Sequence, residues 1–263
     1  MKPSGLRVLT GCNLMKNTQL NILVVDDEPK HRRAAEVLLK GHQLTIVGSY
    51  DEAKEALSSQ TDYDKENDVI MPNLLEKVGL SRNFNPYLKN KDASEADKQK
   101  YRDVCKEARE AATTHPNFDV VLTDLMMPAS RSAQGGEGMQ FVGKQMPVGT
   151  FLILLALNAG IKNIAMVTDT NHHHHPASAA LDPINRSVIR IGDVKIFATN
   201  YASSVIFDEE TGEVLTYEYL RSVEGKAKYP EASDYHHKGT FNGKGWGSIL
   251  NALLENKVDE VGG

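Results

Sequence analysis

Short apolar runs alternate with amphipathic stretches at the start of the chain. The runs Leu20–Val25 and "LTIVGSY" from Leu44 are nearly uninterrupted, which is typical of strands buried on both faces of a parallel sheet. The stretches "EPKHRRAAEVLLKG" from Glu28 and "DEAKEAL" from Asp51 carry apolar residues at helical spacing and predict helices. This alternation of strand and helix predicts an α/β fold built on a parallel sheet.

The same alternation resumes after residue 117. We expect strands at Phe118–Thr123, within "KNIAMVT" (162–168) and at Val194–Thr199. The stretch "GTFLILLALNAG" (149–160) is apolar nearly all round and predicts a fully buried helix. A short helix is expected in "PASAALDP" (176–183), and a final helix in "WGSILNALLEN" (246–256), with Trp246 in the core.

Two segments interrupt this pattern. Residues 59–116 are polar and only partly periodic, but residues 94–112 predict a helix that Ser94 caps, with Asp97 three residues on. Residues 205–220 predict a hairpin turned at Thr-Gly, and residues 221–244, including His236–His237, read as loop. We therefore expect an N-terminal extension (1–19) and one domain (20–263) with insertions at about 59–116 and 203–244.

Composition adds limits rather than a function. The 263 residues include 30 basic and 35 acidic side chains, a net charge of −5, which does not favour a general nucleic-acid surface. The two cysteines have no zinc-type spacing and imply no disulfide framework. The longest apolar run, Phe151–Leu157, is too short to span a bilayer, and the first residues show no clear signal-peptide pattern. A cytoplasmic protein that does not engage membranes is expected.

Chemistry-bearing residues follow three of the predicted strands. Asp26 and Asp27 end the first, Asp124 ends the third, and Thr168 ends the fourth. Because ligands gather at the carboxyl ends of parallel strands, we expect these side chains to meet. Clustered carboxylates repel unless a cation joins them, and oxygen ligands of this kind suit Mg²⁺. The pattern predicts a site that moves a phosphoryl group onto a carboxylate, with Thr168 as a hydrogen-bond donor.

At these motifs the chain resembles the receiver domain of two-component response regulators, in the CheY-like superfamily. "ILVVDDE" is similar to the family's first strand and acidic pair, and "VVLTDLMMP" to its third strand. The match covers roughly residues 20–58 and 117–168 and implies a flavodoxin-like sheet of five parallel strands in the order 2-1-3-4-5. It also implies a histidine kinase or other phosphodonor and an unknown protein output partner.

The resemblance assigns roles to individual residues. Asp124 would be the phosphoacceptor and, with Asp27, a direct Mg²⁺ ligand. Asp26 would bind the ion through water, and the Met126 backbone carbonyl would supply a further ligand. Thr168 matches the family's fourth-strand Ser/Thr.

The chain departs from the family where a lysine normally ends the fifth strand. "FATNYA" stands there, so Asn200 or a neighbour occupies the lysine position, and Lys195 lies toward the wrong end of the strand. Asp169 follows Thr168 where a small residue is usual. Without the lysine, we expect phosphorylation of Asp124 to be slow or absent.

Four consecutive histidines, His172, His173, His174 and His175, follow the fourth strand. Pro176 biases His175 away from helix, so an extended loop is expected, in which at most one alternate pair faces the acidic cluster. Such a pair would suit Zn²⁺ or another transition metal; the simpler interpretation is a solvated polar loop. Gly135, Gly136 and Gly138 likewise read as a flexible loop in preference to a phosphate cradle.

Three hypotheses of function follow. The leading one is an atypical single-domain receiver, a Mg²⁺-dependent phosphorylated signalling switch or interaction module. The second is a metal-dependent hydrolase or phosphotransferase that combines the acidic cluster with the histidine run. The third is a pseudo-receiver that binds partners without phosphorylation. A homodimer is open under each of them.

Overall fold

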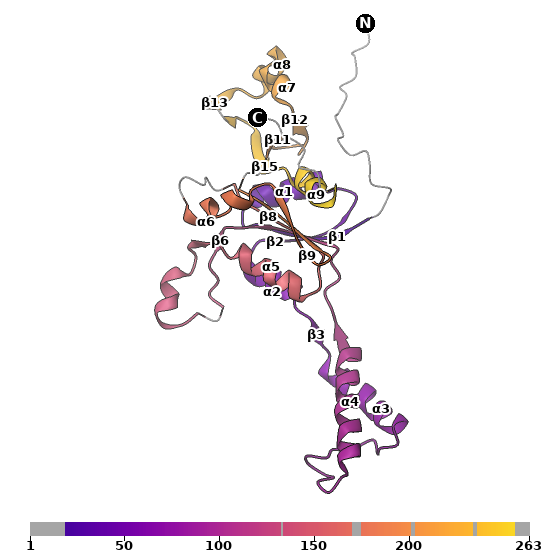
Figure 1. Cartoon of the computed structure of the whole chain (residues 1–263). Helices are drawn as coiled ribbons and strands as arrows, with labels where there is room; N and C mark the ends of the chain where they lie inside the picture. The colour runs from indigo at the N-terminus through magenta and orange to yellow at the C-terminus, as the bar shows by residue number, and fades with distance from the viewer. Residues whose placement is uncertain (1–18, 133, 170–174, 201–202, 234–235, 256–263) are drawn as a thin grey trace.

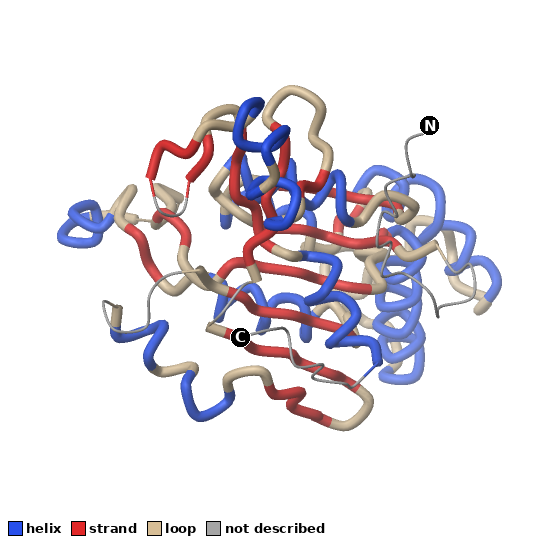
Figure 2. Tube along the Cα trace, turned by 90° about the horizontal axis from the view of Figure 1, so that it is seen from above, coloured by secondary structure: helices blue, strands red, loops and turns tan. Residues whose placement is uncertain are grey.

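The computed structural model describes residues 19–255, apart from 133, 170–174, 201–202 and 234–235. Its centre is a six-stranded sheet in the order β2-β1-β5-β8-β10-β9, whose strands lie side by side in Figure 2. The strands are β1 (Asn21–Val25), β2 (Gln43–Val47), β5 (Val120–Asp124), β8 (Asn163–Val167), β9 (Ser187–Ile191) and β10 (Val194–Thr199).

Five strands of this sheet run parallel, and β9 is antiparallel to β10. The sequence predicted five strands in this sheet and did not predict β9. Two apolar runs flank Gly192–Asp193, and Gly192 has a positive φ of 61°, which permits the tight turn between β9 and β10. The mainly parallel sheet nevertheless places the protein in the α/β class, as expected.

Helices cover both faces of the sheet (Figure 1). Helices α1 (Pro29–Leu38) and α9 (Trp246–Glu255) pack on one face, where Trp246 is fully buried as expected. Helices α2 (Tyr50–Ala56) and α5 (Gly149–Asn158) pack on the other. The expectation that α5 is buried all round was wrong: its exposed side includes Phe151 and Leu154, at 56% and 57% exposure.

The connections on the carboxyl side of the sheet are short or irregular. After β5, a ribbon of β6 (Met127–Pro128) and β7 (Gln145–Met146) carries the 3-10 helix η2 (Gly136–Phe141), which contains Gly136 and Gly138 and is preceded by Gly135. After β8, helix α6 (Pro176–Ala179) and 3-10 helix η3 (Asp182–Ile184) confirm the short helix expected between two prolines.

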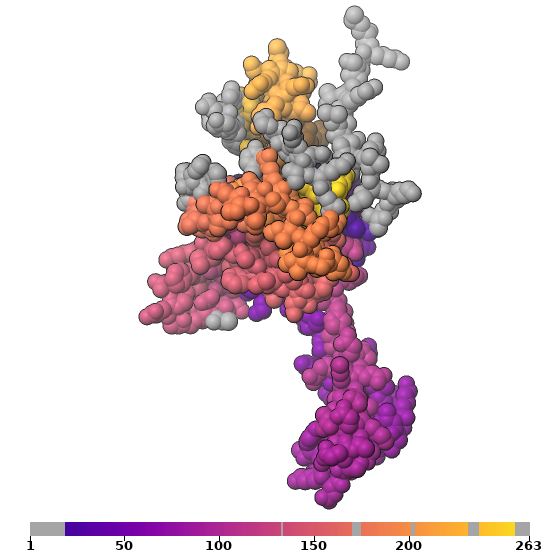
Figure 3. All heavy atoms as spheres, viewed as in Figure 1, coloured from indigo at the N-terminus to yellow at the C-terminus, as the bar shows by residue number. Residues whose placement is uncertain are grey.

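The insertion at 59–116 forms an arm that projects from the body (Figures 1 and 3). The two-stranded ribbon of β3 (Gln60–Thr61) and β4 (Thr113–Thr114) joins it to the domain. The arm contains π-helix η1 (Lys65–Ile70), α3 (Met71–Lys77) and α4 (Glu95–Ala112), around a small core that includes Leu75 and Tyr101. Ser94 caps α4 by accepting from the Asp97 backbone N–H at 3.2 Å, as expected.

The second insertion forms a small sheet on the α1 side of the domain (Figure 1). This accessory sheet has the order β12-β11-β15, from β11 (Ser204–Asp208), β12 (Val214–Leu215) and β15 (Thr240–Lys244). The hairpin expected at 205–220 is present as far as Leu215, but residues 217–220 are helical. The expectation of loop at 221–244 was wrong, because His236–His237 form a strand and β15 pairs with β11. The remaining elements are α7 (Tyr217–Arg221), α8 (Val223–Lys228), β13 (Glu231–Ser233) and β14 (His236–His237).

Residues 1–18, most of the expected N-terminal extension, lie outside the described residues. Across the described ranges, no helix combines the length and the apolar character that crossing a membrane requires.

Candidate functional site

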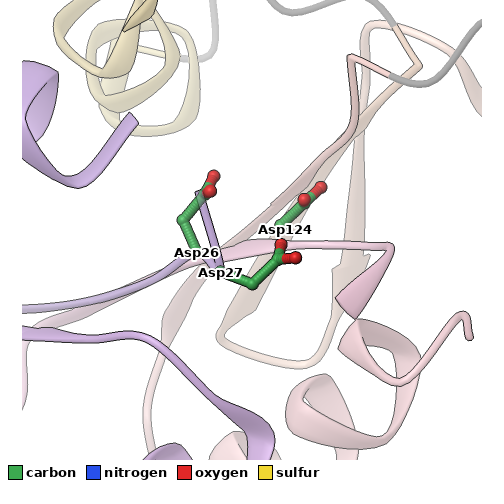
Figure 4. A group of neighbouring side chains, drawn as sticks. All are labelled: Asp26, Asp27 and Asp124. Carbon is green, nitrogen blue, oxygen red and sulfur yellow. The ribbon is translucent and has the colours of Figure 1, made fainter. Parts of the chain in front are cut away.

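Three carboxylates meet at the carboxyl edge of the central sheet (Figure 4). Asp26 and Asp27 directly follow β1, and Asp124 is the last residue of the neighbouring strand β5. One oxygen of each lies within 4.8 Å of the others. Asp26 and Asp124 are buried, with 0% and 4% exposure, and Asp27 is partly exposed. The parallel order of the strands is what brings these residues together.

Close backbone contacts fix the position of Asp124. Leu125 donates its N–H to the Val167 carbonyl at 2.8 Å, which continues the pairing with β8 past the end of β5. Helix α5 begins against the same bend: a Cβ on Gly149 would lie 2.0 Å from the Asp124 carbonyl oxygen. Only glycine permits this approach, so Gly149 allows the first turn of α5 to pack directly against the backbone of Asp124. Thr168, fully buried, directly follows β8 on the adjacent strand.

A lysine that the sequence did not reveal completes the cluster. Lys244, the last residue of β15, places its Nζ 2.7 Å from Asp26 Oδ2 and 3.0 Å from Asp124 Oδ2. Its side chain is 1% exposed, so these ion pairs are shielded from water. The expectation that the site lacks a lysine was therefore wrong, although neither Asn200 nor Lys195 supplies it. The cation arrives from the accessory sheet, outside the matched motifs.

The charges of the cluster influence one another. Burial raises the pKa of Asp26 and raises that of Asp124 to about 7, against the attraction of Lys244. Burial also opposes the charge on Lys244, but the three surrounding carboxylates of Asp124, Asp26 and Asp169 outweigh it and raise the lysine pKa. The single positive charge of Lys244 cannot neutralise three carboxylates, so a further cation or a bound proton would stabilise the cluster.

The donor set fits a hard divalent cation. Among the described residues, Asp124 Oδ1 is buried and has no hydrogen-bond partner, although Oδ2 is paired with Lys244. A buried carboxylate oxygen left unpaired is costly, and an oxygen-ligated ion such as Mg²⁺ would satisfy it. Asp26, Asp27 and Asp124 could hold such an ion. Met126 is buried at the bend two residues beyond Asp124, where the resemblance expects a carbonyl ligand.

Neighbouring side chains secure the acidic pair. Arg32 donates from Nη1 to the backbone carbonyls of Asp26 and Asp27, at 2.8 and 2.7 Å. Gln145, at the return of the glycine-rich loop, donates from Nε2 to Asp27 Oδ2 at 2.9 Å. The loop therefore borders the cluster. It does so through Gln145 on β7; Gly135, Gly136 and Gly138 lie in or beside η2.

A buried histidine adjoins the lysine. His31 on α1 is 4% exposed, and its Nε2 lies 2.9 Å from Asp169 Oδ2. Its Nδ1 lies 3.1 Å from the backbone N of Lys244. The interactions with His31 and Lys244 lower the pKa of Asp169, although burial opposes this. Sequence reasoning noted Asp169 only as a departure from the receiver pattern and missed His31 and Lys244.

The other candidates that the structure describes make their side-chain hydrogen bonds outside the acidic cluster. Asn200 donates from Nδ2 to Asp182 Oδ1 and is thereby tied to η3. Lys195 donates to the Leu254 carbonyl at 3.3 Å, consistent with its place at the opposite end of β10. His175 accepts the Ala177 N–H through Nδ1 and caps α6. His172, His173 and His174 fall outside the described residues.

The site is thus an acidic cluster with one buried lysine, set at the carboxyl edge of a mainly parallel α/β sheet. Comparisons of the chain with protein-family models, curated proteins and solved structures find no match.

Proposed function

We propose that the protein is an atypical receiver, in which Asp124 accepts a phosphoryl group in a Mg²⁺-dependent reaction and thereby switches a signalling interaction. The observation that carries the proposal is the position of Lys244, whose Nζ joins Asp26 and Asp124 at 2.7 and 3.0 Å. The sequence alone argued against efficient phosphorylation because it offered no such cation.

The chemistry follows from the charges. An oxygen of Asp124 attacks the phosphorus of a small acyl phosphate, the phosphorus–oxygen bond to the acyl group breaks, and the carboxylate leaving group departs with the electron pair. Lys244 offsets the negative charge that gathers on the transferred group, and Thr168 is the hydrogen-bond donor on the next strand. Mg²⁺ held by Asp26, Asp27 and Asp124 would supply charge neutralisation and orientation of the phosphoryl oxygens.

The strand order supports the same proposal. The sheet order β2-β1-β5-β8-β10-β9 is compatible with the order expected of a receiver, with the antiparallel β9 taken as an addition at the edge. In such sheets the ligand site lies outside the carboxyl ends of the strands, where Asp26, Asp124 and Thr168 gather. The lysine differs in origin, since it comes from β15 and not from β10.

The test is incubation with acetyl phosphate and Mg²⁺, followed by intact-mass measurement. Wild type should gain one phosphoryl group, and the gain should disappear with a chelator. Asp124→Asn should abolish it, and Lys244→Met should slow it by about tenfold or more, as loss of a charge-assisted contact implies. Asp182→Asn is the matched control, because it neutralises an acid of the same domain that binds Asn200 instead.

The outcomes separate the rivals. No mass gain in wild type, with Mg²⁺ still bound, would overturn the proposal in favour of a pseudo-receiver. Steady phosphate release from many phosphoesters without a labelled intermediate would favour the metal-dependent hydrolase. No histidine joins the metal-ligand group formed by the described residues, so this part of the chain does not favour the hydrolase. A histidine kinase or other phosphodonor and a protein output partner belong to the proposal.

A further inference from the structure

Lys244 reaches the acidic cluster from outside the central sheet, so something must fix its position. The accessory sheet touches the domain at α1: a Cβ on Gly243 would lie 2.4 Å from the Ala34 Cβ, so the glycine allows the backbone of β15 to approach the helix. Trp246, just past β15, donates from Nε1 to the His31 carbonyl at 2.9 Å. These contacts bring β15 beside α1 but do not orient the lysine.

The His31 ring has one protonation pattern that satisfies both of its neighbours. Nδ1 faces the Lys244 backbone N–H at 3.1 Å and must therefore accept. The neutral ring then carries its proton on Nε2 and donates it to Asp169 Oδ2 at 2.9 Å. Because both nitrogens are engaged, His31 is not free to act as a general base or as a metal ligand.

Asp169 contacts both His31 and the ammonium group of Lys244. Its Oδ2 holds His31, and its Oδ1 lies 3.7 Å from Lys244 Nζ. The residue directly follows Thr168, so it joins the β8 end of the site to α1 and β15. The lysine is thus held at its backbone by His31 and at its ammonium group by three carboxylates.

We infer that His31 and Asp169 are positioning residues, which hold Lys244 in the orientation that places its ammonium group against Asp124. The consequence for phosphoryl transfer rests on the proposed function, but the orientation itself does not. In this arrangement α1 and β8 jointly determine whether a lysine carried by the accessory sheet reaches the phosphoacceptor. A cavity of about 80 Å³ is lined in part by His31, Asp169 and Lys244.

The first test is hydrogen exchange at the Lys244 amide in His31→Leu and His31→Asn. Leucine fills the space but offers no acceptor, whereas asparagine can present its side-chain oxygen near the position of Nδ1. We expect amide protection to fall by about tenfold or more in His31→Leu, because a buried N–H loses its partner, and to be largely retained in His31→Asn. His42→Asn is the matched control, since His42 also accepts a backbone N–H through Nδ1, from Leu20 at 3.3 Å.

The second test is a double-variant cycle on the rate of labelling by acetyl phosphate. If His31 acts through the lysine, His31→Leu combined with Lys244→Met should label no more slowly than Lys244→Met alone. An independent structural role would instead give additive losses. Asp169→Ala changes a residue whose side chain is 46% exposed, and it should slow labelling about threefold while Lys244 is present and leave it unchanged in Lys244→Met.

The results distinguish this inference from the proposed function. Wild-type protection of the Lys244 amide in His31→Leu, or additive losses in the cycle, would overturn the positioning role while leaving phosphorylation intact. If wild type takes no phosphoryl group, the proposed function fails, and the exchange measurement still decides whether His31 orients Lys244. Should His31→Leu fail to fold, the Asp169→Ala cycle decides the question: equal slowing with and without Lys244 would overturn it.

Discussion

Replacing Lys244 by methionine tests the electrostatics of the site most directly. Methionine approximates the length and volume of the lysine stem but removes its charge. The variant leaves Asp26 and Asp124 buried beside each other, with exposures of 0% and 4%, and without the cation that pairs with both. The cluster must then take up a proton, bind another cation, or destabilise the fold.

The magnitude can be estimated from the distances. At an effective dielectric constant of about 20, ion pairs at 2.7 and 3.0 Å are each worth about 5–6 kcal/mol before desolvation. Desolvation of the three buried charges offsets much of this, and removing one partner of a buried pair typically costs about 3–5 kcal/mol. Since small domains are stable by about 5–15 kcal/mol, this loss should be large and readily measured.

The assay is urea unfolding at pH 5 and pH 8, with Mg²⁺ and with a chelator. Lys244→Met should lose the most stability at pH 8 in the chelator, because the carboxylates are then ionised without a counter-charge, and Mg²⁺ should restore part of it. Lys195→Met is the matched control, since among the described residues that lysine donates to the Leu254 carbonyl at the other end of β10. Equal stability losses in the two variants at pH 8 would refute the reasoning.

Three further outcomes are expected. Burial raises the pKa of Asp124 to about 7 from 3.8, so its contribution to stability is complete below pH 3.8 and is lost as the pH rises through about 7. In a chelator the unfolding free energy should therefore fall by up to about 4 kcal/mol over that interval, and a flat profile would contradict the assignment. Gly149→Ala should cost about 1–3 kcal/mol and slow labelling, because its Cβ would meet the Asp124 carbonyl, whereas Gly135→Ala, with open space around it, should do neither. Tyr229→Phe removes the hydroxyl that donates to the buried Asp208 carboxylate and should lower the unfolding free energy by about 1.5–3 kcal/mol without affecting labelling, as intact mass and urea unfolding will show.

The parts of the site that sequence reasoning found share a local signal. Asp26, Asp27 and Asp124 each stand at the end of a short apolar run, and a parallel sheet brings such ends to one edge. Recognising the apolar runs and placing their ends at one edge of a parallel sheet requires no knowledge of contacts between distant residues. The α/β class, the parallel strands and the amphipathic helix of the arm were predictable for the same reason.

Lys244 was missed because its position depends on a tertiary contact. Its segment, "TFNGKGW", contains two glycines and follows a polar stretch, so it reads as loop. In the structure the glycines serve the close approach of β15, with Gly243 against Ala34 and Gly245 against Ser203. The available signal was electrostatic: a buried cluster of aspartates requires a cation, and a lysine between glycines next to a buried helix was a candidate.

Two errors arose from reading periodicity alone. An all-apolar helix such as α5 contains no information about which side faces the sheet, so the exposure of Phe151 and Leu154 could not be predicted. Strand β9 was overlooked although Gly192–Asp193 is a typical hairpin turn between two apolar runs. The first error reflects missing tertiary information, and the second could have been avoided.

The distance along the chain between Lys244 and its partners affects the order in which the acidic cluster forms during synthesis. Lys244 and Asp26 are separated by 218 positions, and all five parallel strands precede residue 200. Contacts between such distant residues carry a large loop-closure cost and tend to form late. A growing chain therefore contains all three aspartates of the cluster before Lys244 is synthesised. If Asp124 accepts a phosphoryl group as proposed, it would do so with its lysine in place only after β15 has been translated and docked, and incomplete chains would lack the complete cluster.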